Sequence, residues 1–554
     1  YVNKTNTLFA DLNLAYEISD YITAKVLVGY NINNLDQQNK NPSTSLNPAY
    51  ANYSWGSPNV QQGDTKRQTL NIEPQLTYKN QIGNGVFSAL LGGTLMKRTQ
   101  DNQTIDANNY SSDLFLDNIG AAGSYSIFVS NIDYRYLSGF LRLNYNWNDK
   151  YLFNASVRRD GSSRFGPNNQ YGNFAALGAA WIFSEEKFFK DQSVLSFGKL
   201  RASYGSTGND GIGDYGYYQL WTATSSINNE SSTVLTPTAL ANLDYSWEKV
   251  LKFDVALELG FLKDRILLNA NYYRNSTKDQ LVGLPLPSQT GFTSVNANLP
   301  ALIRNTGVEL SLNTRNINSE TFSWNTDFNI TFQKNELVSF DDLEASTYAN
   351  TYEVGSSILS QKGYLASVDP ETGTYTIQDL NNDGQITYAD DRKILGDRLP
   401  KFYGGLQNNF TYKNWNLGFL FQFVKQEDYN YLNTVYDAVG NRSNFEESVL
   451  NYWKQPGDQV SVPKPSTATS NAFFNSLSSS LHWDDASYIK LRNVNLSYNL
   501  PATWVNQVGM QNARVYFQGQ NLLTITSYKG LDPESKSTFA PPLRIVSLGV
   551  QTNF

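Results

Sequence analysis

The chain has 554 residues, a formal net charge of -7, one histidine and no cysteine. The absence of cysteine excludes disulfides, thiol catalysis and thiolate zinc sites. The lone histidine, His482, excludes a multi-histidine metal site. It is expected to have a surface or packing role, because metal and triad chemistry need convergent partners. The acidic residues are spread along the chain without a basic stripe, so nucleic acid is not an expected partner.

Aromatic residues make up 14% of the chain, including 36 tyrosines and 30 phenylalanines. This composition, together with abundant asparagine and serine, favours strands and turns. The chain contains no run of roughly 18 or more apolar residues, so no transmembrane helix is predicted. Composition therefore leaves two classes, secreted all-β proteins and outer-membrane β-barrels.

Taken in chain order, the predicted elements are strands of period two. A first run covers about 4–19 and ends at a short turn. A run near 489–498 changes phase between Leu491 and Val494, which predicts a β-bulge. Many runs are about 10–15 residues long, closer to the roughly 9–11 residues of a transmembrane strand than to the about 5–6 of an ordinary one. The apolar members of the clearest runs are Leu141/Leu143/Tyr145/Trp147, Phe253/Val255/Leu257/Leu259/Phe261, Ile266/Leu268/Ala270/Tyr272, Val308/Leu310/Leu312 and Trp415/Leu417/Phe419/Phe421/Phe423.

The residues that alternate with these apolar side chains are Arg, Glu, Asp, Asn and Gly. That mixture suits a wet lumen better than the packed core of a sandwich. Aromatic residues gather near the strand ends, as expected for girdles at two membrane interfaces. The alternative is a large soluble β-sandwich or propeller, which predicts shorter strands and more even connections.

The expected connections are uneven, and short and long ones alternate. This is how outer-membrane barrels distribute periplasmic turns and extracellular loops. Two of the periplasmic links, 185–195 and 500–511, are longer and are expected to hold a helical turn. The short turns fall near 19–20, 80–84, 148–150, 262–264, 316–320 and 413–414, and the long segments near 32–64, 100–132, 207–244, 278–303, 335–399 and 429–483.

The number of strands predicts an incomplete barrel. We count about 17 strands, whereas bacterial barrels of this kind have an even number. The first run ends at a short turn and so descends, as does the last, which places the C-terminus in the periplasm. A barrel of about 22 strands would then lack roughly its first five in this chain.

The last run adds an assembly signal. Val546, Leu548, Val550 and Thr552 alternate with polar residues and glycine, and the run ends on Phe554. A final strand with this pattern is typical of outer-membrane proteins recognised by the barrel-assembly machinery, although an ordinary last strand is the alternative.

Several segments together resemble the SusC/RagA family of TonB-dependent outer-membrane transporters. The most recognisable is Tyr151 to Lys190, in which a strand leads into an RxDGSSRFG turn. Further similar segments are LRASYGSTGND at 200–210, WEKVLKFDVALELGFLKDRI at 247–266, YYRNSTKDQLVGLPLP at 272–287, NTGVELSL at 305–312, LPKFYGGLQNNFTYKNWNL at 399–417 and SYIKLRNVNLSYNLP at 487–501. The resemblance covers nearly the whole chain, from about residue 1 to 554.

The resemblance implies an all-β transmembrane antiparallel barrel in the outer-membrane lipid, with residues 1–554 as the C-terminal portion of one domain. It implies import of oligosaccharide or peptide with a SusD-like surface lipoprotein, driven by TonB through a plug. No plug is visible here, so another stretch of polypeptide is expected to close the barrel, because an open sheet edge in lipid is very costly. A scaffold role in an envelope assembly is the alternative, and a secreted glycan-binding module is a third.

One local motif predicts a calcium loop in a long extracellular segment. Oxygen-bearing side chains recur at positions 1, 3, 5, 9 and 12 of the motif, and a glycine that permits a sharp turn stands at position 6. Asp rather than Glu stands at position 12, which makes a bidentate contact less assured. An ordinary Asn/Asp-Gly turn is the alternative. The expected ligands are Asp379, Asn381, Asp383, the Gln385 carbonyl, Thr387 and Asp390.

Two further groups of residues leave alternatives open. Arg158, Arg159, Asp160 and Arg164 surround the RxDGSSRFG turn, where they either face substrate or plug or are solvated charges at a glycine turn. Aromatic residues of the long loops either stack on a ligand or pack the loops; they are Tyr50, Tyr53, Trp55, Tyr215, Tyr217, Tyr218 and Trp221. No GxSxG, P-loop or dinucleotide fingerprint is present, so no enzymatic activity is predicted.

Overall fold

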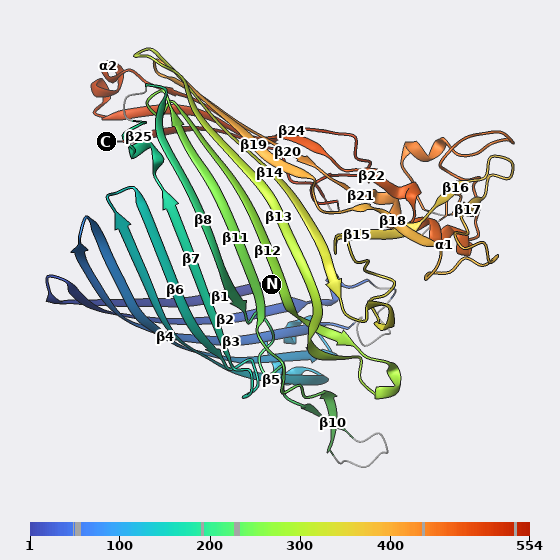
Figure 1. The fold of residues 1–554 in the computed structure, drawn as a ribbon. Helices are drawn as coiled ribbons and strands as arrows, with labels where there is room; N and C mark the ends of the chain where they lie inside the picture. The colour runs from blue at the N-terminus through green and yellow to red at the C-terminus, as the bar shows by residue number, and fades with distance from the viewer. Residues whose placement is uncertain are drawn as a thin grey trace. The chain divides into compact units, whose positions relative to one another are not determined.

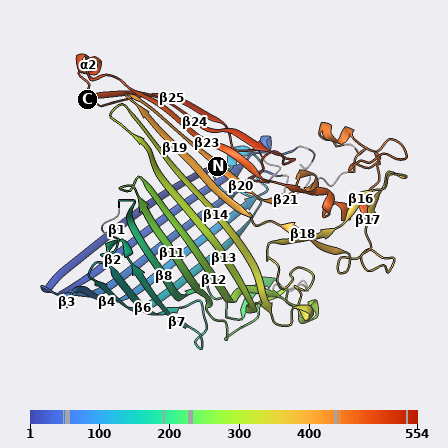
Figure 2. The same ribbon diagram turned by 45° about the horizontal axis from the view of Figure 1, so that its top comes forward.

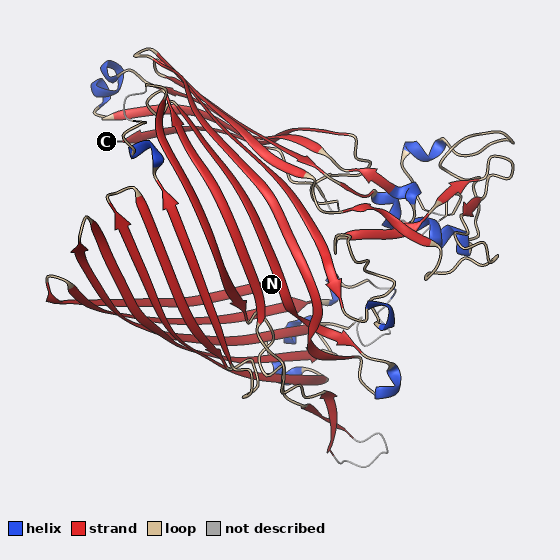
Figure 3. Ribbon diagram, in the orientation of Figure 1, coloured by secondary structure: helices blue, strands red, loops and turns tan. Residues whose placement is uncertain are grey.

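The computed structural model describes residues 1–47, 49, 57–189, 193–225, 233–434, 438–441, 443–536 and 540–553. Within these ranges nearly all regular structure is β-strand, and the helices are short pieces in the connections (Figure 3). The two α-helices are α1 (Asn471–Leu477) and α2 (Ala502–Val505). No helix in the described part of the chain is long and apolar enough to cross a membrane. Phe554 lies outside the described residues.

Seventeen long strands belong to one antiparallel sheet, which confirms the all-β prediction and the expected strand number. They are β1 (Val2–Ser19), β2 (Ile22–Asn41), β3 (Asn59–Ile82), β4 (Gly85–Asn108), β5 (Ser124–Trp147), β6 (Tyr151–Ser162), β7 (Tyr171–Trp181), β8 (Leu195–Asn209), β11 (Glu248–Phe261), β12 (Ile266–Pro285), β13 (Ser294–Asn318), β14 (Phe322–Phe340), β19 (Phe402–Tyr412), β20 (Trp415–Lys425), β23 (Tyr488–Asn499), β24 (Asn512–Thr526) and β25 (Ile545–Asn553).

The remaining strands are short and lie in the long connections as two-stranded pieces. They are β9 (Leu220–Ser225) with β10 (Thr233–Ala239), β15 (Ser360–Tyr364) with β18 (Arg392–Asp397), β16 (Ala366–Val368) with β17 (Tyr375–Ile377), and β21 (Glu427–Tyr429) with β22 (Trp483–Asp485). The 3-10 turns are η1 (Ser43–Ser45), η4 (Asp113–Phe115), η5 (Ile119–Ala121), η6 (Phe183–Glu185), η7 (Ser288–Thr290), η8 (Leu343–Ala345), η9 (Tyr431–Thr434), η10 (Glu447–Leu450), η11 (Ser480–His482) and η12 (Asn506–Val508).

The chain forms two compact units. Unit 1 comprises Tyr1–Ala179, Tyr204–Leu251 and Asp279–Leu299, and unit 2 comprises Ala180–Ser203, Lys252–Lys278 and Pro300–Phe554.

In unit 1, β1 to β6 pair in chain order, each antiparallel to the next (Figure 1). Three of these strands, β3, β4 and β5, are 24 residues long. The expected length of 10–15 residues is therefore wrong for them, although it holds for strands such as β6 and β24. The reason lies in segments such as Gln61–Lys66 of β3, which are polar on both sides, so that the period-two hydrophobic pattern stops before the hydrogen-bonded ladder does.

In unit 2, β14, β19, β20, β23, β24 and β25 pair in that order, and Figure 2 shows the last five side by side. Residues opposite each other on paired strands point to the same side of the sheet. One such row is Phe410, Leu417, Leu496, Phe517 and Leu548, and the adjacent row on the other side is Asn409, Gly418, Asn495, Gln518 and Ser547. We call these sides the apolar face and the polar face in both units. The predicted alternation is thus confirmed across five strands.

The predicted β-bulge in β23 is confirmed at Arg492. On the β20 side, Leu491 and Asn493 pair with consecutive residues, Phe421 and Leu420, so Arg492 has no partner opposite. The register against β24 also shifts between Leu491 and Asn493. The extra residue adds Arg492 to the polar face, where its side chain contacts Gln422.

Connections alternate between short and long along the sheet, as predicted. The two longer links on the short-turn side contain η6 and α2 with η12, which confirms the expected helical turns. The short side comprises 20–21, 83–84, 148–150, 182–194, 262–265, 319–321, 413–414 and 500–511, and the long side 42–58, 109–123, 163–170, 210–247, 286–293, 341–401, 426–487 and 527–544.

Candidate functional site

The RxDGSSRFG turn joins β6 to β7 and is built around Arg164. Its guanidinium donates to Asp214 Oδ1 at 2.9 Å and to the Asp210 carbonyl at 2.8 Å, and it lies 4.6 Å from the centre of the Tyr134 ring. The Tyr134 hydroxyl and the Ser162 hydroxyl both donate to Asp210 Oδ2, at 2.8 and 2.7 Å. Arg164 therefore ties the turn to the loop that follows β8.

A buried aromatic cluster lies beneath this turn. Phe165 is only 1% exposed and packs against Trp247 with ring centroids 5.1 Å apart. The Trp247 indole N–H donates to the Gln170 carbonyl at 3.1 Å. The cluster joins the turn to the end of the 210–247 connection and consists of Phe165, Phe174, Tyr217, Tyr245 and Trp247.

The arginines of this turn divide between the two readings of the sequence. Arg158 donates to Asp160 at 2.5 Å and to the Tyr136 hydroxyl at 2.6 Å. Its guanidinium, like that of Arg164, is therefore held in place by other side chains of the protein. Arg159 points to the opposite side of β6 and lies over the Tyr171 ring at 5.0 Å. Arg158, Asp160 and Arg164 thus support a structural role, and Arg159 is the charge that stays exposed.

The long-loop aromatics are divided in the same way. The Tyr215 hydroxyl accepts a hydrogen bond from the Asp133 amide at 2.9 Å, and Tyr217 is buried in the aromatic cluster, so both pack the loop. Tyr218 and Trp221 are about half exposed. Tyr50, Tyr53 and Trp55 lie outside the described residues.

The predicted calcium loop connects β17 to β18 and folds as a series of tight turns. The first turn is closed by Asp379, which accepts from the Asn382 and Gly384 amides at 2.7 and 2.8 Å. The glycine has φ +82°, a conformation that side chains rarely adopt, as the motif requires. Asp383 accepts from the Gln385 amide at 2.7 Å and from the Asn381 side chain at 3.0 Å.

The far end of this loop is closed by two adjacent aspartates. Asp390 accepts from the Thr387 hydroxyl at 2.9 Å. Asp391 is fully buried and accepts from the Leu380 and Thr387 amides at 2.8 and 2.7 Å, which fixes both ends of the loop together. No motif or spacing in the sequence predicts this role for Asp391.

The expected ligands are brought into one loop but not into one carboxylate cluster. The described residues contain no group of three or more His, Cys, Asp or Glu side chains that could hold a metal ion. Each carboxylate has about four lone-pair sites, so its amide contacts leave acceptor capacity for a cation. The donor set is therefore compatible with calcium once Asp390 turns toward Asp379 and Asp383.

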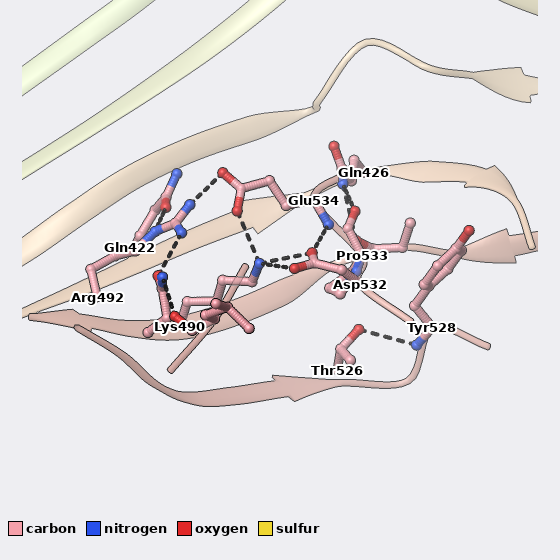
Figure 4. A network of polar contacts seen from close by, with 12 residues as sticks. Gln422, Gln426, Lys490, Arg492, Thr526, Tyr528, Asp532, Pro533 and Glu534 are labelled. Carbon is pink, nitrogen blue, oxygen red and sulfur yellow. Dashed lines mark hydrogen bonds and ion pairs between the residues drawn. The ribbon is translucent and has the colours of Figure 1, made fainter. Parts of the chain in front are cut away.

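A second polar network holds the last long connection against the polar face of the sheet (Figure 4). The Lys490 ammonium, only 3% exposed, donates to both oxygens of Asp532 at 2.8 and 2.9 Å and to Glu534 at 2.9 Å. Arg492, the bulged residue, pairs with the other Glu534 oxygen. The Gln426 side chain donates to the Pro533 carbonyl at 2.8 Å. We call residues 527–536 the pinned loop.

Burial opposes ionisation of both loop carboxylates, but the Lys490 hydrogen bonds hold the pKa of Asp532 and that of Glu534 below their ordinary values. A carboxylate whose pKa is lowered by folding stabilises the fold at neutral pH and loses that contribution as the pH falls through its folded-state pKa. The pinned loop is thus held by ion pairs at neutral pH.

Sequence reasoning missed this network, although part of its signal was present. The cations Lys490 and Arg492 are two residues apart, at the point where the strand pattern changes phase. The acidic pair Asp532 and Glu534 follows in the next long connection. Their pairing depends on contacts between residues 42 to 44 positions apart, which period-two analysis does not address.

The lone histidine is a packing residue, as expected. His482 is 7% exposed at the end of η11, where its carbonyl accepts from the Asn430 amide at 2.8 Å. Its Nδ1 atom has no hydrogen-bond partner among the described residues. Burial, opposed by the charge of Asp484 and assisted by that of Lys529, lowers the pKa of His482 to about 4.

Comparison with known proteins gives a consistent result. The family described as "TonB dependent receptor-like, beta-barrel" matches residues 1–522. "TonB-dependent receptor P3" of Formosa agariphila is 31% identical over 96% of this chain and 55% of its own length. "TonB-dependent receptor SusC" of Bacteroides thetaiotaomicron is 31% identical over 72% of this chain and 41% of its own length.

Among solved structures, the RagAB peptide transporter has a chain that superposes with a TM-score of 0.86 at 25% identity. The superposition covers 100% of the present chain and 62% of the other. The chain spans about half the length of the relatives that it matches.

Proposed function

Because the chain belongs to the TonB-dependent receptor-like β-barrel family, we propose that residues 1–554 form the C-terminal portion of the barrel of a SusC-like outer-membrane importer. The observation that carries the proposal is the family match over residues 1–522. The sheet supports it physically, because its strands have one apolar face and one polar face, as a barrel between lipid and a wet lumen requires.

The proposed orientation follows from the connections. Short turns belong to the periplasmic side of such barrels and long connections to the extracellular side. The strand β25 follows a long connection, so it descends and its C-terminal end is periplasmic. The assembly signal at Phe554 would then be presented to the barrel-assembly machinery from the periplasm.

The proposed cargo is an oligosaccharide or a peptide, and the proposed partners are a SusD-like surface lipoprotein and TonB. One solved relative belongs to a peptide transporter, and the resemblance to the SusC/RagA family implies both classes of cargo. The long connections, with Tyr218 and Trp221 half exposed, supply the surface on the extracellular side. Energy from TonB would reach the receptor through a plug.

Deleting the gene for the complete receptor is expected to abolish uptake of one class of oligomer, because no other route would carry a molecule of that size. Uptake is measured with fluorescently labelled oligosaccharides and peptides, and loss of TonB should have the same effect. Restoring the unaltered gene is the control. A deletion that leaves every uptake intact but disrupts an envelope complex would overturn import in favour of a scaffold role.

We further propose that the 379–390 loop binds one structural Ca²⁺ through Asp379, Asn381, Asp383, the Gln385 carbonyl, Thr387 and Asp390. Oxygen ligands and a glycine at the sharp turn suit this hard cation. The ion would draw Asp390 toward the other carboxylates and stiffen a loop that is extracellular in the proposed orientation.

Replacing Asp383 with alanine in the complete receptor is expected to abolish this calcium binding. Changes to groups that only support a metal ligand typically cost about 10–100-fold in affinity, and loss of a ligand should cost more. Calorimetric titration with Ca²⁺ measures the effect. Asp369→Ala is the matched control, because that aspartate closes the nearby β16–β17 turn with amide contacts outside the motif. Equal affinity in Asp383→Ala and the parent would exclude the site.

A further inference from the structure

A groove on the apolar face of unit 1 lies next to a group of exposed cations. The apolar face of this unit contains one row of Leu76, Leu91, Leu141 and Val157, which are in register across β3 to β6. Further along the strands, toward the long connections, the groove has a volume of about 450 Å³. Leu70, Leu95, Leu137, Gly161 and Tyr171 line it, together with Lys97 and Arg135.

The cations stand where the apolar series ends. Lys97 and Arg135 are opposite each other on β4 and β5, and their side chains are 51% and 69% exposed. Both belong to the apolar face, because Leu95 and Leu137, each two residues away on the same strand, pair with each other on that face. Arg159 lies on the same face of β6, since Gly161 two residues later pairs with Leu137.

The position of these cations matches the edge of a hydrocarbon layer. Tyr145 lies in register with Phe87 and Phe153, an aromatic row near the short-turn end of the same face. Arg135 is ten residues away along β5, which is about 33 Å at ~3.3 Å per residue. Strands tilted by about 35–45° convert that length into roughly 25 Å across the membrane, the height of the apolar band in such barrels.

The cluster carries a net positive charge. Asp133 is paired with both Lys97, at 3.7 Å, and Arg135, at 3.0 Å. Together the three cations, Lys97, Arg135 and Arg159, and this one carboxylate have a net charge of +2. Arg159 contacts the Tyr171 ring and has no ion pair within the described residues. Further out on the same face, Lys66 and Asp101 are opposite each other and cancel.

Glycine residues leave room beside these charges. Gly93, Gly139 and Arg159 form one row on this face, so two successive glycines lie on the β5 side of the arginine. A Cβ atom at Gly139 would meet nothing within 4 Å. The ring of Tyr171 covers Gly161 and forms the far wall of the groove. An apolar groove that opens beside exposed guanidinium groups fits an amphiphile with an anionic head and a hydrocarbon tail.

We propose that Lys97, Arg135 and Arg159 bind the phosphate of a phosphorylated glycolipid in the outer leaflet, with one acyl chain in the adjacent groove. The proposal rests on the proposed function, which places this face in lipid and the long connections outside. Guanidinium groups match the geometry of phosphate oxygens and form charge-assisted hydrogen bonds with them. The lysine stem can lie along the groove while its ammonium reaches the head-group level.

The complete receptor, purified in detergent, is tested with monophosphorylated lipid A by native mass spectrometry. The triple variant K97Q/R135Q/R159Q is expected to bind at least tenfold less lipid than the parent. A second triple variant, K25Q/R67Q/R142Q, removes the same charge from the polar face of neighbouring strands and should bind like the parent. Lipid A without phosphate should bind as weakly to the parent as the phosphorylated lipid does to the first variant.

The outcomes separate this inference from the proposed function. Inorganic phosphate at equal concentration should not displace the lipid, because it lacks the acyl chain for the groove. Binding that is equal in the first variant and the parent, or equal for both lipids, overturns the site. If that variant loses the lipid but still imports cargo, the inference and the proposed function both hold. A receptor that is soluble and monodisperse without detergent overturns both.

Discussion

Replacing Lys490 with methionine is expected to destabilise the docked state of the pinned loop by about 3–5 kcal/mol. The substitution removes the cation that contacts both oxygens of Asp532, whose side chain is only 6% exposed. Arg492 still pairs with Glu534, so the cost falls mainly on Asp532. A buried carboxylate without a counter-ion is more costly than the intact pair, since its desolvation is no longer offset by an opposite charge.

Hydrogen exchange of residues 528–536 in the complete receptor measures this effect. The amides of Glu534 and Lys536 report directly, because they donate to Asp532 at 2.7 and 2.9 Å. Their protection should fall by about two to four orders of magnitude, as about 1.4 kcal/mol corresponds to each tenfold change. Unchanged protection would show that the ion pairs do not hold the loop.

Two further variants separate charge from packing. The triple change K490M/D532N/E534Q removes the cation and both carboxylates, so it should recover most of the protection lost in Lys490→Met. Lys425→Met breaks an exposed pair with Asp485, in which both side chains are more than one third exposed. Such pairs contribute about 0–1 kcal/mol, so this control should leave protection almost unchanged.

The predictable part of the fold is the part fixed by a local pattern. Alternation in runs such as Trp415 to Phe423 reports directly on which side of the sheet is apolar, so strand number and the alternation of connections could be predicted. The bulge at Arg492 was visible for the same reason, because an extra residue shifts the phase of the pattern. Strand ends were not predictable, since β3 and β4 continue through polar segments and β5 contains a segment, Ile127 to Val129, that is apolar on both sides.

The site residues were harder to predict because their partners are distant in the sequence. Arg159 and Arg164 are five residues apart in one motif, yet Arg164 is satisfied by Asp210 and Asp214 while Arg159 lies over the Tyr171 ring. Sequence spacing contains no information about that division. The adjacent pair of Asp390 and Asp391 shows the same limit, because the spacing of the motif did not predict that Asp391 is buried and closes the loop.

Lowering the pH to 4.5 is expected to destabilise the folded connection between β20 and β23. The contribution of His482 alone is about 2–3 kcal/mol. Burial holds the pKa of this imidazole at about 4, against an ordinary value of 6.5. Each pKa unit corresponds to about 1.4 kcal/mol, so protonation would cost about 3 kcal/mol once complete. The sign follows from proton uptake: below pH 6.5 the unfolded histidine binds a proton that the folded one excludes. Stability is therefore unaffected above pH 6.5 and decreases as the pH falls toward 4.

The comparison of the parent with His482→Gln isolates this contribution, because carboxylates titrate in both proteins. The unfolding free energy of the complete receptor is measured between pH 8 and 4 for both proteins. The parent and the variant should differ in the slope of this free energy against pH and not only in its absolute value. The glutamine variant should show the flatter dependence even if its stability at pH 8 is lower. Selective labelling of histidine identifies the ring signal as the one that disappears in the variant, and its titration midpoint should lie near pH 4. A midpoint near 6.5 with parallel pH profiles would mean that the imidazole is hydrated, and that the small apolar cavity of about 60 Å³ beside it admits water.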